Sequence, residues 1–283
     1  MEISAFKQQV AQDWAGDDAV ATWQKHFPKM REQMAAVTNA LIEAAQPQPG
    51  MRILDLASGN GEPALSLARR VAPNGHVTAT DLNEGMLSAL RANAEADQVT
   101  NIETKVCDAH ELPFADGSFD LVTSRFGVMF FADTPAALRE ITRVLKSGGR
   151  VAFLVWGPPG PGTYFGAAAL PFMRRLAVKP DPDGPGPMRF AESRKLATVL
   201  EEVGFVNVEE RSANLPAAYR GSPQELLTCM MDIAAPFRNG AATLSHEERT
   251  AAEQEALNNL GAVYDGILTK VTAPVIMVTG MRS

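Results

Sequence analysis

Two hydrophobic patterns alternate along the middle of the chain: short apolar runs, and longer stretches with an apolar residue every three or four positions. The run MRILDL at 51–56 is typical of a buried strand. The turn ASGNG at 57–61 follows it, and Pro63 then begins a stretch whose apolar residues share one helical face. The order of strand, glycine turn and helix predicts the first unit of a parallel sheet.

The same alternation continues to Trp156. Asn83 is expected to cap one of the intervening helices, and Thr134 with Pro135 to begin another that stops at Gly148 and Gly149. Strands joined by helices in this way predict a doubly wound α/β fold, in which ligands bind at the carboxyl ends of the strands. The expected strands are 51–56, 76–81, 102–106, 119–123 and 150–156.

The composition changes after Trp156. Residues 157–190 hold 8 of the 19 prolines, so we expect a loop-rich insertion with a short helix in the apolar stretch 164–176. A helix closed by Gly204 and a sixth strand at 205–210 follow. A second insertion, 215–270, contains two capping boxes that begin at Ser222 and Ser245, and the segment TAPVIMVTGMR predicts a last strand.

Residues 1–48 precede the first strand and are expected to be helical, with Pro28 marking a break. Two interpretations stay open for this segment: a helix packed against the domain, or a lid over a bound ligand. The wall of such a lid would include Trp14, Trp23, His26 and Phe27.

Composition excludes several classes of function. The 283 residues carry a net charge of −7 and show no basic stripe, which argues against a nucleic-acid partner. No apolar run is long enough to span a membrane, and the first residues do not resemble a signal peptide, so we expect a cytoplasmic protein without membrane insertion. Cys107 and Cys229 are the only cysteines, and neither they nor the 4 histidines have the spacing of a metal site.

The glycine turn fits two kinds of cofactor. Gly59 and Gly61, with Asp81 about 20 residues later, match the dinucleotide fingerprint. However, Asp55 lies behind the turn and Asp108 follows the third strand. A pyrophosphate gains nothing from further carboxylates, whereas a cationic ligand does. A nicotinamide-dependent oxidoreductase therefore stays as the alternative to an enzyme with a cationic cofactor.

Residues 51–156 resemble the class I S-adenosylmethionine-dependent methyltransferases, and within them the ubiquinone and menaquinone methyltransferase type. The resemblance rests on ILDLASGNG, VTATDLNEGM, CDAHELPF, LPFADGSFDLV, SRFGVMFFAD, ALREITRVLK and GGRVAFLVW, in this order. It implies a seven-stranded, mostly parallel sheet whose last strand enters antiparallel between the fifth and sixth. The methyltransferase domain would then be 49–283, with helical lid insertions at 157–190 and 215–270 and an N-terminal lid segment at 1–48.

The resemblance also implies S-adenosylmethionine as the cofactor. Asp81 would bind the ribose hydroxyls, and Asp108 with the Ala109 N–H would bind the adenine. Leu82 and Met86 are candidates for contacts to the adenine faces, and Arg125 either binds a carboxylate or forms a surface ion pair. The predicted cofactor-binding residues are Asp55, Ala57, Ser58, Gly59, Gly61, Asp81, Leu82, Met86, Asp108, Ala109, Ser124 and Arg125.

The implied reaction is in-line methyl transfer to an oxygen, nitrogen or carbon atom of a small, apolar or aromatic acceptor. No catalytic residue is assigned, and the candidates for a general base are His26, His110, Glu111, Tyr164 and Tyr219. A protein that binds the cofactor without catalysis is a further alternative. Monomer and homodimer are both compatible with the sequence.

Overall fold

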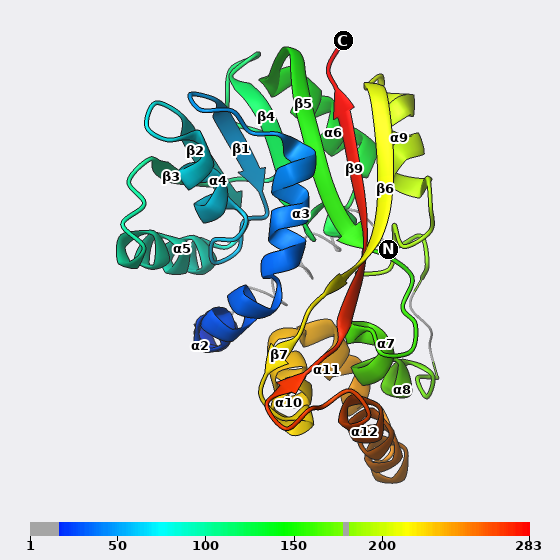
Figure 1. Ribbon diagram of the computed structural model, residues 1–283. Helices are drawn as coiled ribbons and strands as arrows, with labels where there is room; N and C mark the ends of the chain where they lie inside the picture. The colour runs from blue at the N-terminus through cyan, green and yellow to red at the C-terminus, as the bar shows by residue number, and fades with distance from the viewer. Residues whose placement is uncertain (1–16, 178–180) are drawn as a thin grey trace.

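The computed structural model describes residues 17–177 and 181–283, so Trp14 lies outside the described residues. Its centre is a seven-stranded sheet in the order β3-β2-β1-β4-β5-β9-β6 (Figure 1). β9 is antiparallel to β5 and β6, whereas the other neighbouring pairs are parallel, which confirms the predicted topology. The strands are β1 (Arg52–Leu56), β2 (His76–Asp81), β3 (Ile102–Val106), β4 (Phe119–Arg125), β5 (Leu145–Trp156), β6 (Val206–Pro216) and β9 (Thr272–Met281).

Helices cover both faces of this sheet. α3 (Ala35–Ala45) crosses β4, β5, β9 and β6 at the front of Figure 1, and α6 (Thr134–Val144) and α9 (Lys195–Val203) lie behind. α4 (Ala64–Val71) and α5 (Glu84–Ala96) pack against β1, β2 and β3. The apolar strand residues are enclosed between these layers, and their removal from water is the main stabilising contribution.

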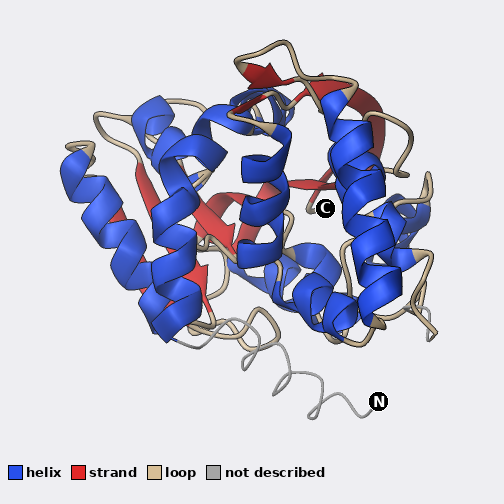
Figure 2. Ribbon diagram, turned by 90° about the horizontal axis from the view of Figure 1, so that it is seen from below, coloured by secondary structure: helices blue, strands red, loops and turns tan. Residues whose placement is uncertain are grey.

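A further group of helices lies below the carboxyl ends of the parallel strands (Figure 1), and Figure 2 views the molecule from that side. We call these elements the cover. Both predicted capping boxes are present in it, at Ser222 and Ser245. Two helices were not predicted, the second of the two short helices within 164–173 and the helix Ala235–Ala242, and neither was the two-stranded sheet. The cover consists of α7 (Tyr164–Ala168), α8 (Leu170–Met173), β7 (Tyr219–Arg220), α10 (Pro223–Ile233), α11 (Ala235–Ala242), α12 (His246–Gly261) and β8 (Leu268–Thr269).

The predicted break at Pro28 is wrong, because Pro28 lies inside α2 (Asp17–Gln33) and the helix ends five residues later. Proline removes one helical hydrogen bond. Contacts on both sides hold the helix through this position: His26 pairs with Asp232, and Arg31 pairs with Glu62.

The predicted helix stop at Gly148 and Gly149 is also wrong. α6 ends at Val144, and both glycines lie inside β5. Leu145 already pairs with Phe119 of β4, and the register shifts after this pair, as at a β-bulge. β6 likewise extends beyond the predicted 205–210, because its pairing with β9 continues to Pro216. Within the described ranges, no helix is both long and apolar enough to cross a membrane.

Candidate cofactor-binding site

The glycine turn after β1 is held in a left-handed conformation. Ala57, Gly59 and Gly61 have φ angles of 53°, 52° and 135°. A Cβ atom at Gly61 would lie 2.7 Å from Cδ1 of Leu65, so this glycine allows the turn to pack on α4. A Cβ atom at Gly59 would meet no atom within 4 Å, so the backbone there faces open space. A ligand can therefore approach the Gly59 backbone closely.

Ser58 holds the turn in place through two hydrogen bonds. Its hydroxyl donates to the backbone oxygen of Asp55 at 2.9 Å, and its N–H donates to the backbone oxygen of Thr80 at the same distance. The side chain is buried. Both hydrogen bonds shape the turn and join it to β2, whereas binding of the cofactor by Ser58 stays a prediction.

Asp81, the last residue of β2, lies directly beside the turn. Its carboxylate accepts the N–H of Gly59 at 2.9 Å and the N–H of Asn83 at 3.0 Å. Burial raises the pKa of Asp81, while these backbone hydrogen bonds oppose the shift. A carboxylate has four lone-pair positions, so Asp81 can still accept hydrogen bonds from a ligand's hydroxyl groups.

Asp108 follows β3 and is brought next to Asp81 by the sheet register. Val106 pairs with Asp81, and the N–H of Cys107 donates to the Asp81 backbone oxygen at 3.2 Å. The carboxylate of Asp108 accepts from the N–H of His110 and from its ring nitrogen Nδ1. The two acids thus lie at the ends of neighbouring strands, as predicted.

The imidazole ring of His110 is hydrogen-bonded within the protein through both of its nitrogens. Its Nε2 accepts the backbone N–H of Asp133 at 3.0 Å, so the proton of the neutral ring is on Nδ1, which donates to Asp108. Both ring nitrogens are therefore engaged within the protein. This histidine fixes the Asp108 loop against the start of α6.

Asp55 lies behind the turn and is fully buried. Oδ1 accepts the hydroxyl of Thr123 at 2.6 Å, whereas Oδ2 has no hydrogen-bond partner among the described residues. Burial raises the pKa of Asp55 to about 6, against the effect of the Thr123 hydrogen bond. A nearby positive charge would restore its ionised form.

The ends of β1 and β4 are packed closely together. The Ser124 hydroxyl is fully buried and donates to the Leu56 backbone oxygen at 3.0 Å. A Cβ atom at Gly127 would lie 2.5 Å from Oγ of Ser124 and 2.6 Å from Cβ of Ala57. Gly127 was not among the predicted site residues, although it lies in the SRFGVMFFAD segment.

Arg125 does not form a surface ion pair. Its guanidinium is partly buried and donates to the hydroxyl of Thr38 in α3 at 2.7 Å, while its Nε has no hydrogen-bond partner among the described residues. Burial lowers the pKa of Arg125, and the charges of Glu62 and Asp55 oppose the shift. Glu62 was missed in the sequence analysis, although an acid directly after the glycine turn is the signal that could have identified it.

The residues predicted to contact the adenine differ in solvent exposure. Leu82 is 46% exposed beside Asp81, whereas Met86 is buried on the inner face of α5. Ala109 is partly buried in the loop after Asp108. An exposed leucine next to the Asp81 carboxylate offers an apolar surface for a planar ring.

Aromatic side chains connect the end of β4 with the cover. Phe126 adopts a φ of 61° and stacks on Trp156 with 4.0 Å between ring centroids. Trp156 in turn stacks on Tyr164 at 5.8 Å and meets the edge of Phe165 at 4.8 Å. A positive φ at a phenylalanine is strained, and such strain is common at functional sites.

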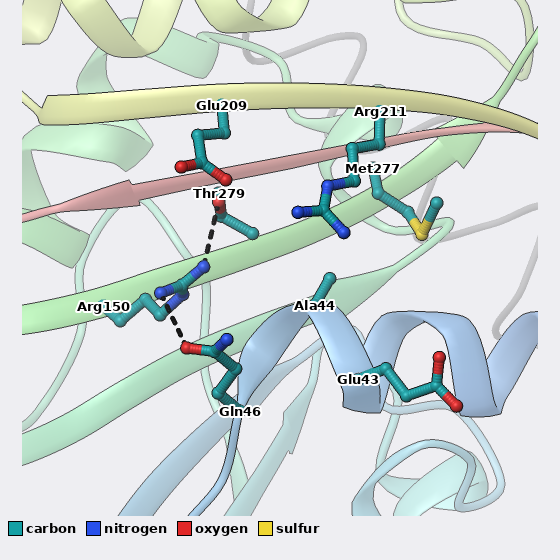
Figure 3. Close-up of a pocket in the computed structure, with 8 residues that line it drawn as sticks. All are labelled: Glu43, Ala44, Gln46, Arg150, Glu209, Arg211, Met277 and Thr279. Atoms are coloured by element: carbon teal, nitrogen blue, oxygen red, sulfur yellow. Dashed lines mark hydrogen bonds between the residues drawn. The ribbon is translucent and has the colours of Figure 1, made fainter.

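Two cavities lie away from the carboxyl ends of the parallel strands. One, of about 50 Å³, lies between α3 and strands β5, β9 and β6, where Arg150 donates to Gln46 and Thr279 (Figure 3). The other, of about 240 Å³, is lined by residues of α10 and α12. Neither is lined by the turn, by Asp81 or by Asp108. In the described part of the chain, no group of three His, Cys, Asp or Glu residues is arranged to hold a metal ion.

The strand order, the antiparallel β9 and the acids at the ends of successive parallel strands define a class I S-adenosylmethionine-dependent methyltransferase, with S-adenosylmethionine as the methyl donor. The residues fit this cofactor, because the open Gly59 backbone lies beside Asp81 and the unpartnered Asp55 oxygen suits a cationic ligand. The chain belongs to the ubiE/COQ5 methyltransferase family, whose sequence model matches residues 20–161.

Individual relatives agree with this assignment. The chain is 35% identical over 183 residues to the ubiquinone/menaquinone biosynthesis C-methyltransferase UbiE of Cupriavidus metallidurans, covering 59% of this chain and 72% of that protein. It is 34% identical over 194 residues to UbiE of Laribacter hongkongensis, covering 64% and 78%. Among solved structures, a SAM dependent methyltransferase from Aquifex aeolicus matches with a TM-score of 0.52 and 14% identity over the full length of both chains, a likeness in fold.

Proposed function

We propose that this methyltransferase binds S-adenosylmethionine across the ends of β1, β2 and β3 and methylates an oxygen, nitrogen or carbon atom of a small, apolar or aromatic acceptor. The observation that carries the proposal is the Asp81 carboxylate bonded to the Gly59 N–H, with Asp108 at the next strand end. In this assignment Asp81 binds the ribose hydroxyls and Asp108 the adenine. Ala57, Ser58, Gly61, Ser124 and Gly127 shape the turn.

The cofactor supplies an activated methyl group, so the protein acts chiefly by orientation and by exclusion of water. In the proposal, the stacked aromatic residues Phe126, Trp156 and Tyr164 line the acceptor side. The cover encloses it together with 17–48, the described part of the predicted N-terminal lid segment 1–48, of which 1–16 lie outside the described residues. The names of the UbiE relatives favour a carbon acceptor on a quinone precursor.

The candidate general bases differ in their ability to accept a proton. Both nitrogens of His110 are engaged, and burial raises the pKa of both Tyr164 and Tyr219, which disfavours their phenolates. His26 pairs with Asp232 through Nε2 at 2.8 Å, and when Nε2 donates to this carboxylate the other ring nitrogen can accept a proton. A carbon acceptor that is already a phenolate needs no base for the methyl transfer itself, and the methylated ring carbon then loses its proton to a base or to water to restore the aromatic ring.

The test is calorimetric titration with S-adenosylmethionine, S-adenosylhomocysteine and NADH in parallel, followed by transfer of labelled methyl to a panel of quinols, phenols and amines. Binding of the first two ligands with transfer to a panel member supports the proposal. Binding of NADH alone would support the oxidoreductase alternative, and binding without transfer to any acceptor the non-catalytic one. Sedimentation of the purified chain distinguishes a monomer from a homodimer, and fractionation of expressing cells tests the cytoplasmic location.

A further inference from the structure

The hydroxyl group of Tyr164, the first residue of α7, is buried in the cover and has no role in the proposed function so far. The residue is 5% exposed, and its hydroxyl makes no hydrogen bond with another described residue. It is also not one of the fully enclosed polar atoms of the described chain, so the hydroxyl faces an opening. A buried tyrosine usually has a hydrogen-bond partner, because an unpaired polar group has lost its bonds to water. The Tyr164 hydroxyl is therefore free to bond to a ligand.

The ring that carries this hydroxyl is held firmly in place. It lies nearly parallel to the indole of Trp156, with 5.8 Å between the ring centroids, and Phe165 meets it edge-on at 5.4 Å. The Thr163 side chain caps α7, and Thr163 also forms a β-bridge with Thr272 of β9. A ligand that bonds to Tyr164 thus meets a preorganised group, and the protein loses little side-chain entropy on binding.

The surroundings of Tyr164 make its hydroxyl a hydrogen-bond donor and not a base. Burial raises the pKa of Tyr164, and the nearby Cys229 and Tyr219 act in the same direction. The hydroxyl therefore keeps its proton at neutral pH and can donate it in a hydrogen bond. The complementary ligand group is one that accepts a hydrogen bond, such as a hydroxyl, phenolate or carbonyl oxygen.

The position of Tyr164 relates it to the acceptor side of the site. α7 belongs to the cover, below the carboxyl ends of the parallel strands (Figure 1). Phe126, directly after β4, stacks on Trp156 at 4.0 Å, and its neighbour Gly127 packs so closely on Ala57 of the glycine turn that an added Cβ would lie 2.6 Å from the Ala57 Cβ. The aromatic stack therefore leads from the glycine turn to Tyr164. If the cofactor binds at this turn, as in the proposed function on which this inference rests, Tyr164 faces the acceptor.

Tyr164 also lies outside the residues that the family model matches. That match covers 20–161, which includes the glycine turn, Asp81 and Asp108, and it ends just before α7. The groups proposed to hold the methyl donor thus belong to the part of the chain that resembles the family. A group in the cover is the kind that can distinguish one acceptor from another.

We propose that the Tyr164 hydroxyl donates a hydrogen bond to an oxygen atom of the acceptor and thereby selects an aromatic acceptor that carries such an oxygen. The acceptor ring packs along the stack of Phe126, Trp156 and Tyr164, and the hydrogen bond fixes its orientation toward the methyl donor. Tyr164 moves no proton in this scheme. It is a specificity-determining residue, because a hydrocarbon of the same shape leaves the buried hydroxyl unpaired.

The affinity test compares two probes of nearly the same shape, 2-naphthol and 2-methylnaphthalene, on the full chain saturated with S-adenosylhomocysteine. We expect Tyr164→Phe to weaken 2-naphthol binding roughly 3- to 10-fold, the effect of one hydrogen bond, and to retain or strengthen 2-methylnaphthalene binding. Tyr219→Phe is the matched control, because Tyr219 is 2% exposed but has the Lys29 ammonium 5.2 Å from its ring centroid. It is expected to leave the ratio of the two affinities unchanged. Equal changes for both probes in Tyr164→Phe, or the same shift of the ratio in Tyr219→Phe, would overturn the assignment.

The second measurement needs no ligand. Phenylalanine retains the stacking on Trp156 and removes only the hydroxyl, so Tyr164→Phe is expected to leave the midpoint of urea unfolding unchanged or slightly raised. A clearly lower midpoint would mean that the hydroxyl has its partner within the protein, and it would contradict the inference. Absence of 2-naphthol binding to a chain that binds S-adenosylhomocysteine would contradict it as well. If S-adenosylhomocysteine itself does not bind, the proposed function fails, which distinguishes the two failures.

Discussion

The backbone N–H of Gly59 donates a hydrogen bond to the carboxylate of Asp81 at 2.9 Å. The glycine turn and the acid that ends β2 are thus parts of one structural unit, although each was assigned from a separate motif. Either residue can be changed without disturbing the hydrophobic core. This makes the pair suitable for testing the site.

Gly59→Val and Asp81→Asn are each expected to reduce S-adenosylhomocysteine affinity by roughly 10- to 100-fold or more, while the chain stays folded. Valine blocks the approach to the backbone, and asparagine removes the charge proposed to hold the ribose. Gly148→Val is a matched control for the first variant, because Gly148 also has a positive φ, 73°, and no atom within 4 Å of an added Cβ. Retained affinity in both site variants, measured by calorimetry, would contradict the site.

The raised pKa of Asp55 gives a pH dependence of stability. The folded chain holds this proton up to about pH 6, whereas the ordinary value for an aspartate is 3.8. The free energy of unfolding therefore falls as the pH rises through this window, by up to ~3 kcal/mol from this residue. Asp55→Asn should flatten that part of the curve in chemical denaturation, and Asp116→Asn, an exposed acid, should not. An unfolding free energy that increases over the window because of Asp55 would refute the assignment.

Ligand binding should show the opposite trend in the same window. A cationic ligand favours the ionised form of Asp55, so S-adenosylmethionine affinity is expected to increase as the pH rises through about 6. The increase should be smaller in Asp55→Asn. Calorimetry at several pH values measures it, and an affinity that does not depend on pH in either protein would argue against contact between this charge and the ligand.

His110→Ala should affect the cofactor site through Asp108. The variant loses the bonds to Asp108 and to the Asp133 N–H, and we expect a loss of about 1–3 kcal/mol in stability together with weaker S-adenosylhomocysteine binding. His76→Ala is the control, because His76 is partly exposed at the far end of β2. Lost methyl transfer with unchanged binding and stability would instead indicate a catalytic role for His110.

Trp156→Ala is expected to cost about 3–5 kcal/mol of stability, because the indole is buried between Phe126 and Tyr164. Trp156→Phe retains one stacking surface and should cost markedly less. Urea denaturation compares the two variants. Similar losses in the two variants would mean that ring stacking does not join the strand ends to the cover.

The sequence predicted the first three strands of the sheet to within a residue, because apolar runs there are bounded by glycine, proline and capping residues. The helix boundaries predicted at Pro28 and at Gly148–Gly149 were wrong for one common reason. Contacts with distant segments outweighed the local preference of each residue, through the partners of α2 in one case and the pairing of Leu145 with Phe119 in the other.

The site was predictable where it consists of motifs. Asp81 ends one predicted strand, and Gly59 lies in the glycine turn after another. The carboxyl ends of parallel strands lie at one edge of a sheet, so the sequence alone implies that the two residues meet there. The pairing of Arg31 with Glu62 was not predictable, because nothing local relates a surface-type arginine in an N-terminal helix to an acid 31 residues later. The same holds for the engagement of His110, which depends on the N–H of Asp133.

The long cover insertion leaves the sheet from β6 and returns through β9, and its two ends are held together by the pairing of Pro216 with Thr272. A segment whose ends meet on adjacent strands can change in length and sequence without altering the path of the remaining chain. Replacing this segment would therefore change the part of the cover that it forms, while α7, α8 and the strands of the sheet keep their path. The same junction offers protein engineers a place to graft the corresponding segment of a relative.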